Sequence, residues 1–308
     1  MDVLKRIIDR SPVPPSILQI LLGVVLGPSV LGALEHGHSV SFLAETGVFL
    51  LLVQVGSHLD IEGMRRVGRH ALSVGVGGVV APFAVTFSVA RWPMGQSTVA
   101  SMFMATALSV TSIGITAHVF RANGLLQSDE ARIVLGAAVV DDVIGLAVLT
   151  IVTVVSGTGS VDAGGIGRTL SIVGALSIGI ALGGSTHGRV ASARLSPVAA
   201  LLVPFFFLDI GLRVDLSLFG DARVERWTVV LIAVAVATKA VSGLLVRDRS
   251  VDRLLVGISM VPRGEVGLVV AGTAIAAGAV DPSAYAMVLA TVVASTILVP
   301  PFVRWRAG

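Results

Sequence analysis

Apolar stretches of about 20 residues recur along the whole chain and are separated by short segments rich in charged residues, Gly, Pro and Ser. A helix needs about 20 residues to cross the roughly 30 Å hydrocarbon core of a bilayer. The pattern therefore predicts an all-α membrane protein with about ten transmembrane helices in one domain, residues 1–308. The helices are expected near residues 14–34, 41–59, 71–90, 97–120, 130–156, 164–187, 196–213, 227–246, 253–279 and 282–303.

Composition supports the bilayer as the solvent. Hydrophobic residues make up 54% and charged residues 13% of the chain, whereas about 25% charged residues are usual for a soluble domain. The absence of cysteine excludes disulfides, thiolate chemistry and cysteine zinc sites. The net charge of +3 comes from basic residues in short loops, which indicates membrane orientation and no nucleic acid partner.

Basic residues are unevenly divided between the two sides of the predicted helices. With the N-terminus inside, 15 Lys and Arg residues fall on the inner side and five on the outer side. Inner loops of membrane proteins carry such an excess. We therefore expect a multi-pass protein of the cell membrane with both termini in the cytoplasm.

Two segments of the chain resemble each other weakly. Residues 49–60 and 205–215 are both apolar, and each has a Gly four residues before a terminal Asp. The first would end inside and the second outside, which is typical of inverted-repeat transporters with a site at the midplane. The predicted halves are residues 14–156 and 196–303, joined by a linker helix at 164–187.

Several charged side chains fall where lipid is expected. Asp141 and Asp142 lie at the middle of the fifth span, Lys239 at the middle of the eighth, and Arg263 and Glu265 in the ninth. Each charge costs about 2.5–3.5 kcal/mol at mid-membrane, so these groups are functional candidates. Neighbouring residues of a helix point about 100° apart, which predicts that one carboxylate pairs with Lys239 while the other binds a proton or a bare cation. The alternative is an inert buried ion cluster.

Two predicted spans contain signals for a broken helix. The fourth carries Thr111 and Ser112 among small residues, and the ninth carries Pro262 and Gly264. Non-helical backbone at membrane depth is tolerated where it lines a cavity, so we predict an ion site there. The hydroxyls of Thr111 and Ser112 could instead bond to their own helix.

The segments 26–32, 111–116, 132–146 and 261–268 resemble the monovalent cation:proton antiporters. The Asp-Asp pair with a Lys is similar to the electrogenic sodium/proton exchangers more than to the Kef-type potassium efflux systems. The resemblance implies an inverted-repeat fold with two crossed broken helices. It also implies roles for eight residues: ion and proton binding by Asp142, where the monovalent cation would sit, with Asp141, Thr111 and Ser112 close by; charge pairing of Lys239 with Asp141; and core bracing by Arg132, Arg263 and Glu265.

The chain departs from this family in two respects. About three of the family's helices are not recognisable, one of them before residue 26 and a pair between residues 180 and 195. The scaffold side is thus reduced, which predicts a homodimer with residues 17–34 and the sixth span at its interface. Asp209 stands where the family has a small or apolar residue, and a polar contact or a second titrating site would explain it.

The six histidines are expected on the surface without metal-ligand spacing: His36, His38, His58, His70, His118 and His187.

The predicted function is secondary active antiport of Na⁺, or else K⁺, against protons, without a cofactor and without enzymatic activity. Two alternatives stay open. A degenerate, non-transporting relative could sense ions or assemble with a partner. An intramembrane aspartyl protease would also need two membrane aspartates, but on different helices.

Overall fold

The computed structural model describes residues 15–58, 68–157, 174, 175, 177–179, 181, 182 and 186–307. Their contacts divide the chain into two compact units. Unit 1 comprises the described residues of Met1–Asp60 and Thr153–Ser217, and unit 2 those of Ile61–Val152 and Leu218–Gly308. Each unit therefore combines a segment from the first half of the chain with one from the second half.

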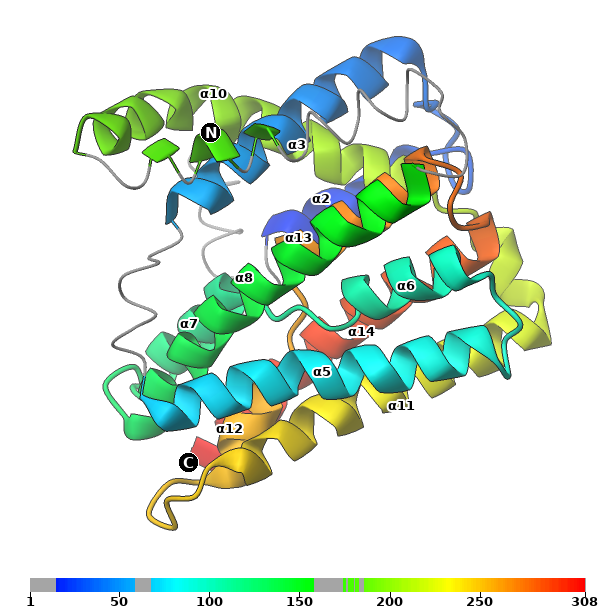
Figure 1. Ribbon diagram of the computed structural model, residues 1–308. Helices are drawn as coiled ribbons and strands as arrows, with labels where there is room; N and C mark the ends of the chain where they lie inside the picture. The colour runs from blue at the N-terminus through cyan, green and yellow to red at the C-terminus, as the bar shows by residue number, and fades with distance from the viewer. Residues whose placement is uncertain are drawn as a thin grey trace. The chain divides into compact units, whose positions relative to one another are not determined.

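Unit 1 contains the helices α2 (Pro15–Leu26), α3 (His38–His58) and α10 (Thr186–Leu212). Helix α10 packs along both α2 and α3 (Figure 1). Glycines bring α2 and α10 close together, because a Cβ atom at Gly23 would meet the carbonyl oxygen of Leu208 and one at Gly211 would meet that of Ile20. Small residues at such contacts allow the backbones of membrane helices to approach each other.

Two boundaries in unit 1 differ from the prediction. The first helix ends at Leu26 instead of residue 34, because Pro28 lacks an N–H donor and disfavours a helical residue before it. Helix α10 begins at Thr186 and not near residue 196. The polar residues at its start favour a loop in the sequence, yet polar side chains do not prevent a helix, and the apolar stretch begins at Arg194. Most of the predicted span 164–187 lies outside the described residues.

Unit 2 contains most of the longer helices. They are α5 (Arg69–Arg91), α6 (Thr98–Ala107), α7 (Ile113–Ala122), α8 (Asp129–Gly157, whose last residues belong to unit 1), α11 (Ala222–Ser242), α12 (Arg253–Ser259), α13 (Glu265–Ala276) and α14 (Pro282–Ala307). Short 3₁₀ turns flank α11 at Leu216–Gly220 and Gly243–Leu245. Helix α5 runs beside α6 and α11, and α14 packs on α11 (Figure 1).

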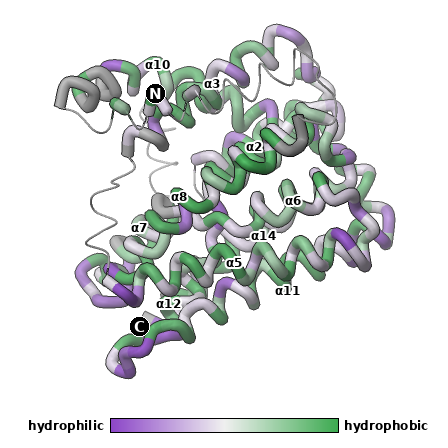
Figure 2. Tube along the Cα trace, in the orientation of Figure 1, coloured by the Kyte–Doolittle hydropathy of each residue, from purple (hydrophilic) through white to green (hydrophobic). Residues whose placement is uncertain are grey.

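Apolar residues dominate the helices of both units, and hydrophilic residues gather at their ends (Figure 2). In the described part of the chain, five helices are long and apolar enough to cross a membrane: Arg69–Arg91, Asp129–Val154, Arg194–Leu212, Ala222–Leu245 and Pro282–Val303. Four shorter apolar helices accompany them in the same part of the chain. The prediction of an all-α membrane protein is confirmed.

The fourth and ninth predicted spans are each interrupted. Residues 108–112 separate α6 from α7, and residues 260–264 separate α12 from α13. On one side of the breaks, a buried apolar core joins α5, α7, α8, α12 and α14 through residues such as Val74, Phe120, Val134, Val256 and Val299. The breaks thus lie inside packed protein, as non-helical backbone at membrane depth requires.

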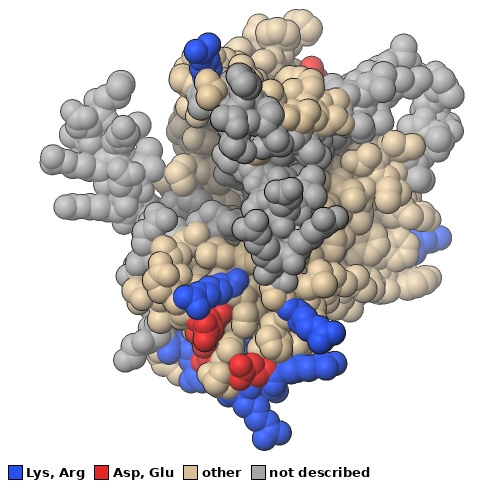
Figure 3. Space-filling view, turned by 60° about the vertical axis from the view of Figure 1, so that its left-hand side comes forward, with Lys and Arg blue, Asp and Glu red and all other residues tan. Residues whose placement is uncertain are grey.

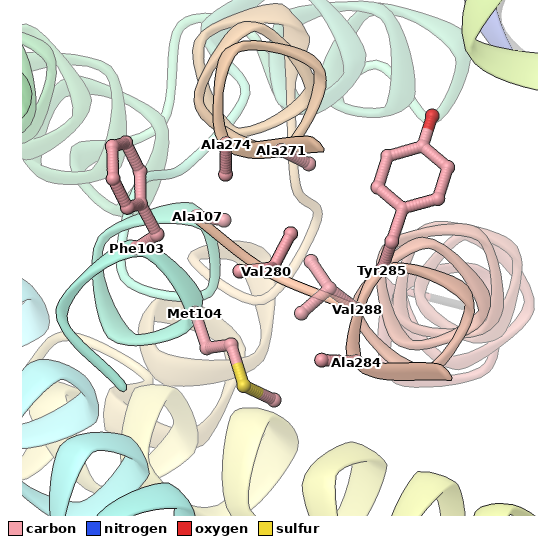
Figure 4. Close-up of a pocket in the computed structure, with 9 residues that line it drawn as sticks. All are labelled: Phe103, Met104, Ala107, Ala271, Ala274, Val280, Ala284, Tyr285 and Val288. Carbon is pink, nitrogen blue, oxygen red and sulfur yellow. The ribbon is translucent and has the colours of Figure 1, made fainter. Parts of the chain in front are cut away.

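A small apolar cavity lies between α6, α13 and α14 (Figure 4). Its lining includes Phe103, Met104, Ala271 and Val288, and the hydroxyl of Tyr285 points away from its centre. A water or an ion needs polar partners in a cavity. The apolar lining of the cavity therefore offers no polar ligand to an ion.

Candidate functional site

The two interrupted helices cross at their breaks and are joined by three hydrogen bonds. The Ser112 backbone N–H donates to the Pro262 carbonyl at 2.9 Å. The hydroxyls of Thr111 and Thr116 donate to the carbonyls of Met260 and Ser259, each at 3.0 Å. Three carbonyls that a continuous helix would have satisfied are thus bonded across the crossing.

Glycines allow this close crossing. A Cβ atom on Gly264 would lie 2.7 Å from Ser112 Cβ and 2.9 Å from Ser112 Cα. A Cβ atom on Gly267 would lie 2.6 Å from the Ala107 carbonyl oxygen. Any larger side chain at these positions would push the two broken helices apart.

A buried ion pair lies beside the crossing. Lys239 Nζ on α11 donates to Asp141 Oδ2 on α8 at 2.6 Å, and both side chains are fully buried. The ammonium also donates to the Thr111 hydroxyl at 2.6 Å. Gly78 on α5 lies next to it, since a Cβ atom there would be in ordinary contact with Nζ at 3.5 Å. Three helices and the first break therefore meet at one ammonium group.

The Asp141 carboxylate has one oxygen open to a ligand. Its Oδ1 atom is buried and has no hydrogen-bond partner among the residues that the structure describes. A buried polar atom without a partner is costly and calls for an explanation such as a proton, a water or an ion. Asp142, the next residue of α8, is half-buried and acts electrostatically on Lys239. Two carboxylates with hard oxygen ligands and one ammonium are thus gathered in a small volume.

Arg263 is fully buried at the same crossing. Its Nη1 atom donates to the Val110 carbonyl at 3.4 Å, and Nη2 donates to the Ala235 carbonyl at 3.1 Å. Its backbone N–H donates to the Thr296 hydroxyl at 3.3 Å. The guanidinium thereby connects the first break to α11, and the backbone of Arg263 connects the second break to α14.

Two further predicted residues, Ser112 and Arg132, make side-chain contacts at the start of a helix. Ser112 Oγ accepts the Ile115 backbone N–H at 3.3 Å, so the hydroxyl satisfies a free donor at the start of α7. Arg132 is exposed and pairs with Asp129 in the first turn of the same helix at 3.2 Å. The core-bracing role expected of Arg132 stays a prediction. Glu265 opens α13, and its side chain lies outside the described atoms.

A polar cluster in unit 1 surrounds Asp209, for which a polar contact was one of the two explanations expected, although the sequence did not predict its partners. Asp209 is buried, and its Oδ1 atom lies 2.7 Å from His36 Nδ1, while Arg213 Nε donates to Oδ2 at 2.9 Å. His36 Nε2 lies 3.2 Å from the Ser41 hydroxyl. His36 is on the surface as predicted, but it is also a partner of Asp209. The spacing of Arg213 four residues after Asp209 was the available signal.

Comparison with known proteins assigns the chain to a family. The family model described as the transmembrane sodium/hydrogen exchanger matches residues 3–171 and 166–305. The chain belongs to the sodium/hydrogen exchanger family. Exchangers of this kind are secondary transporters, so the comparison does not favour the protease alternative.

Two curated relatives and one solved structure show how this exchanger compares with others. It is 29% identical to the high-affinity Na⁺/H⁺ antiporter NhaS3 of Synechocystis sp., with 96% of this chain and 78% of the relative covered. It is 26% identical to the Na⁺/H⁺-K⁺ antiporter GerN of Bacillus cereus, with 96% and 90% covered. The structure of the sodium proton antiporter MjNhaP1 from Methanocaldococcus jannaschii has a TM-score of 0.70 at 13% identity, with 99% and 94% covered.

The alignments also bear on the length of this exchanger. The match to NhaS3 extends over 358 residues, although the chain has 308. The relative therefore has internal segments with no counterpart here. The family model likewise matches in two pieces that meet near residues 166–171. The structural match shows that the antiporter fold is retained despite this shortening.

Proposed function

We propose that this exchanger is a secondary antiporter that moves Na⁺, with K⁺ as the second candidate, against protons. The observation that carries the proposal is the buried Asp141 carboxylate at the crossing of two broken helices. One of its oxygens bonds to Lys239, and the other has no hydrogen-bond partner within the described residues. Helix breaks of this kind surround the ion sites of secondary transporters.

The two carboxylates have separate roles in this proposal. Asp141 holds the Lys239 ammonium, and Asp142 carries the cation and the proton in turn. A cation approaching Asp142 meets the repulsion of the nearby ammonium, so binding competes with the charge on Lys239. Exchange then follows because Asp142 cannot hold the cation and the proton at the same time.

The test measures cation-driven proton movement in proteoliposomes for Na⁺, K⁺ and Li⁺ in turn. The wild type is expected to move protons in response to a gradient of at least one of them. Asp142→Asn should abolish this movement while the protein still folds. Asp129→Asn is the matched control, because Asp129 lies on the same helix with an exposed side chain. Retained exchange by Asp142→Asn would contradict the site, and an inactive wild type would favour the degenerate relative.

The orientation in the cell membrane is part of the proposal. Charged side chains gather over one end of unit 2 (Figure 3), where Arg306 pairs with Asp252 at 2.7 Å and Arg253 donates to the Arg247 carbonyl at 3.1 Å. We expect this end and both termini to face the cytoplasm, in line with the excess of basic residues on that side. Cleavage by a protease added to the outside of intact cells would contradict this orientation if it occurred in the 247–253 loop.

We also propose that the exchanger is a homodimer in the membrane. Helix α2 exposes Leu21, Leu22 and Val25 in the isolated chain, and a second copy could cover this face. Native mass spectrometry from lipid nanodiscs is expected to give twice the chain mass. A strictly monomeric protein that exchanges cations would refute the dimer and leave antiport intact.

A further inference from the structure

We propose that Thr111 is a positioning residue that holds the Lys239 ammonium in place, and that it is not a ligand of the transported cation. This inference rests on the proposed antiport function. It replaces the role that the sequence suggested for Thr111, which was ion binding. Its consequence is that removal of the hydroxyl should strengthen cation binding, whereas removal of a ligand would weaken it.

The hydroxyl of Thr111 donates one hydrogen bond and accepts another. Its single proton is donated to the Met260 carbonyl at 3.0 Å, and one lone pair accepts from Lys239 Nζ at 2.6 Å. Thr111 as a whole residue is 2% exposed. A hydroxyl has one proton and two lone pairs, so only one lone pair is left. A cation bound there would lie beside the ammonium, and the two positive charges would repel each other.

The surroundings of Lys239 fix its position. The ammonium has two short contacts of 2.6 Å, one to Asp141 and one to Thr111. Thr111 belongs to the first break and Met260 to the second, so the chain of bonds runs from Lys239 through Thr111 into both broken helices. Hydrogen bonds to charged groups are stronger than neutral ones. The ammonium is therefore anchored to the crossing as well as to the carboxylate.

These hydrogen bonds determine how strongly Lys239 opposes the binding of the cation. Each bond that stabilises the ammonium beside Asp141 opposes cation binding at Asp142, because the ammonium repels the cation. Loss of the bond to Thr111 favours the cation-bound state. The apparent KM for Na⁺ of Thr111→Val is expected to fall about tenfold, which corresponds to about 1.4 kcal/mol. The maximal rate should change less than the KM.

The experiment compares Na⁺-dependent exchange of three variants with the wild type in proteoliposomes. Thr111→Val keeps the shape and removes the hydroxyl, and Thr111→Ser should restore the wild-type KM because it keeps the hydroxyl. Thr150→Val is the matched control, since the Thr150 hydroxyl donates within its own helix to the Leu146 carbonyl at 2.9 Å. A KM that rises or stays unchanged in Thr111→Val would overturn the proposal.

A second measurement does not depend on transport. Thermal unfolding in detergent is measured for Thr111→Val, Lys239→Met and the double variant, which form a double-mutant cycle. We expect Thr111→Val to lower the Tm less in the Lys239→Met background than in the wild type. Equal losses would overturn the proposal. If Thr111→Val does not fold, Thr111→Ala takes its place in the cycle.

The two measurements separate the possible failures. If the wild type exchanges no cation, the proposed function fails, and the cycle still decides whether Thr111 holds Lys239. If the wild type exchanges cations and the KM moves in the wrong direction, only the role of Thr111 is refuted.

Discussion

The close contact between the broken helices can be tested with one added methyl group at Gly264. In Gly264→Ala the new Cβ atom would start 2.7 Å from Ser112 Cβ and 2.9 Å from Ser112 Cα. Ordinary carbon contacts lie at about 3.5–4.0 Å. Because Ser112 Cα is a backbone atom, no rotation of a side chain can relieve the contact. The two segments must therefore separate by several tenths of an ångström.

The magnitude follows from the cost of overpacking a dense interior. An extra methyl group in a packed core costs about 1–3 kcal/mol of unfolding free energy. The displacement also strains the bond of 2.9 Å from the Ser112 N–H to the Pro262 carbonyl. We expect Gly264→Ala to lose this free energy in denaturant unfolding in detergent and to show reduced exchange.

Gly220→Ala is the matched control for this prediction. Gly220 ends a 3₁₀ turn, and a Cβ atom there would meet nothing within 4 Å. Surface substitutions of this type change the unfolding free energy by about 0.5 kcal/mol or less. Equal stability of Gly264→Ala and Gly220→Ala would refute the close crossing described above.

Three further predictions concern single side chains. Lys239→Gln should weaken the voltage dependence of exchange measured on proteoliposomes, because moving one elementary charge through 100 mV is worth about 2.3 kcal/mol. An unchanged response of exchange to the membrane potential would reject the role of Lys239 in moving charge. Asp209→Leu leaves Arg213 without its carboxylate partner and is expected to cost about 1–3 kcal/mol in denaturant unfolding, so an unaffected variant would show that the cluster is dispensable. The backbone N–H and the hydroxyl of Ser250 hold the pKa of Asp248 below its usual 3.8. This loop contact should therefore persist at every pH above about 4 and be lost as the pH falls through the lowered pKa. A pKa of Asp248 at or above 3.8 in a carboxyl NMR titration would contradict the contact.

Much of the site could be predicted because charges inside lipid-facing segments are conspicuous. Asp141, Asp142 and Lys239 each interrupt an apolar run, and Pro262 with Gly264 marks the second break. The choice of Asp141 as the partner of Lys239 came from the family resemblance. Helix geometry alone shows that adjacent carboxylates point apart, without saying which of them faces α11.

Contacts between distant segments could not be predicted in this way. His36 and Asp209 are 173 positions apart, and Thr111 and Met260 are 149 apart. In both cases one partner is a loop or break residue, where no helical or strand period fixes the direction of the side chain. The roles of Ser112 and Arg132 were inferred from the family resemblance, and the hydrogen bonds of their side chains are each made near the start of a helix.

The coupling of sodium transport to proton transport can be measured most directly with radioactive sodium. Proteoliposomes containing the wild type and loaded with acidic buffer are diluted into alkaline buffer that contains the labelled ion. The account predicts that the outward proton gradient drives sodium uptake above the external concentration, and that a proton ionophore or Asp142→Asn removes this accumulation. Sodium that only equilibrates across the membrane, or that accumulates equally in Asp142→Asn, would contradict it.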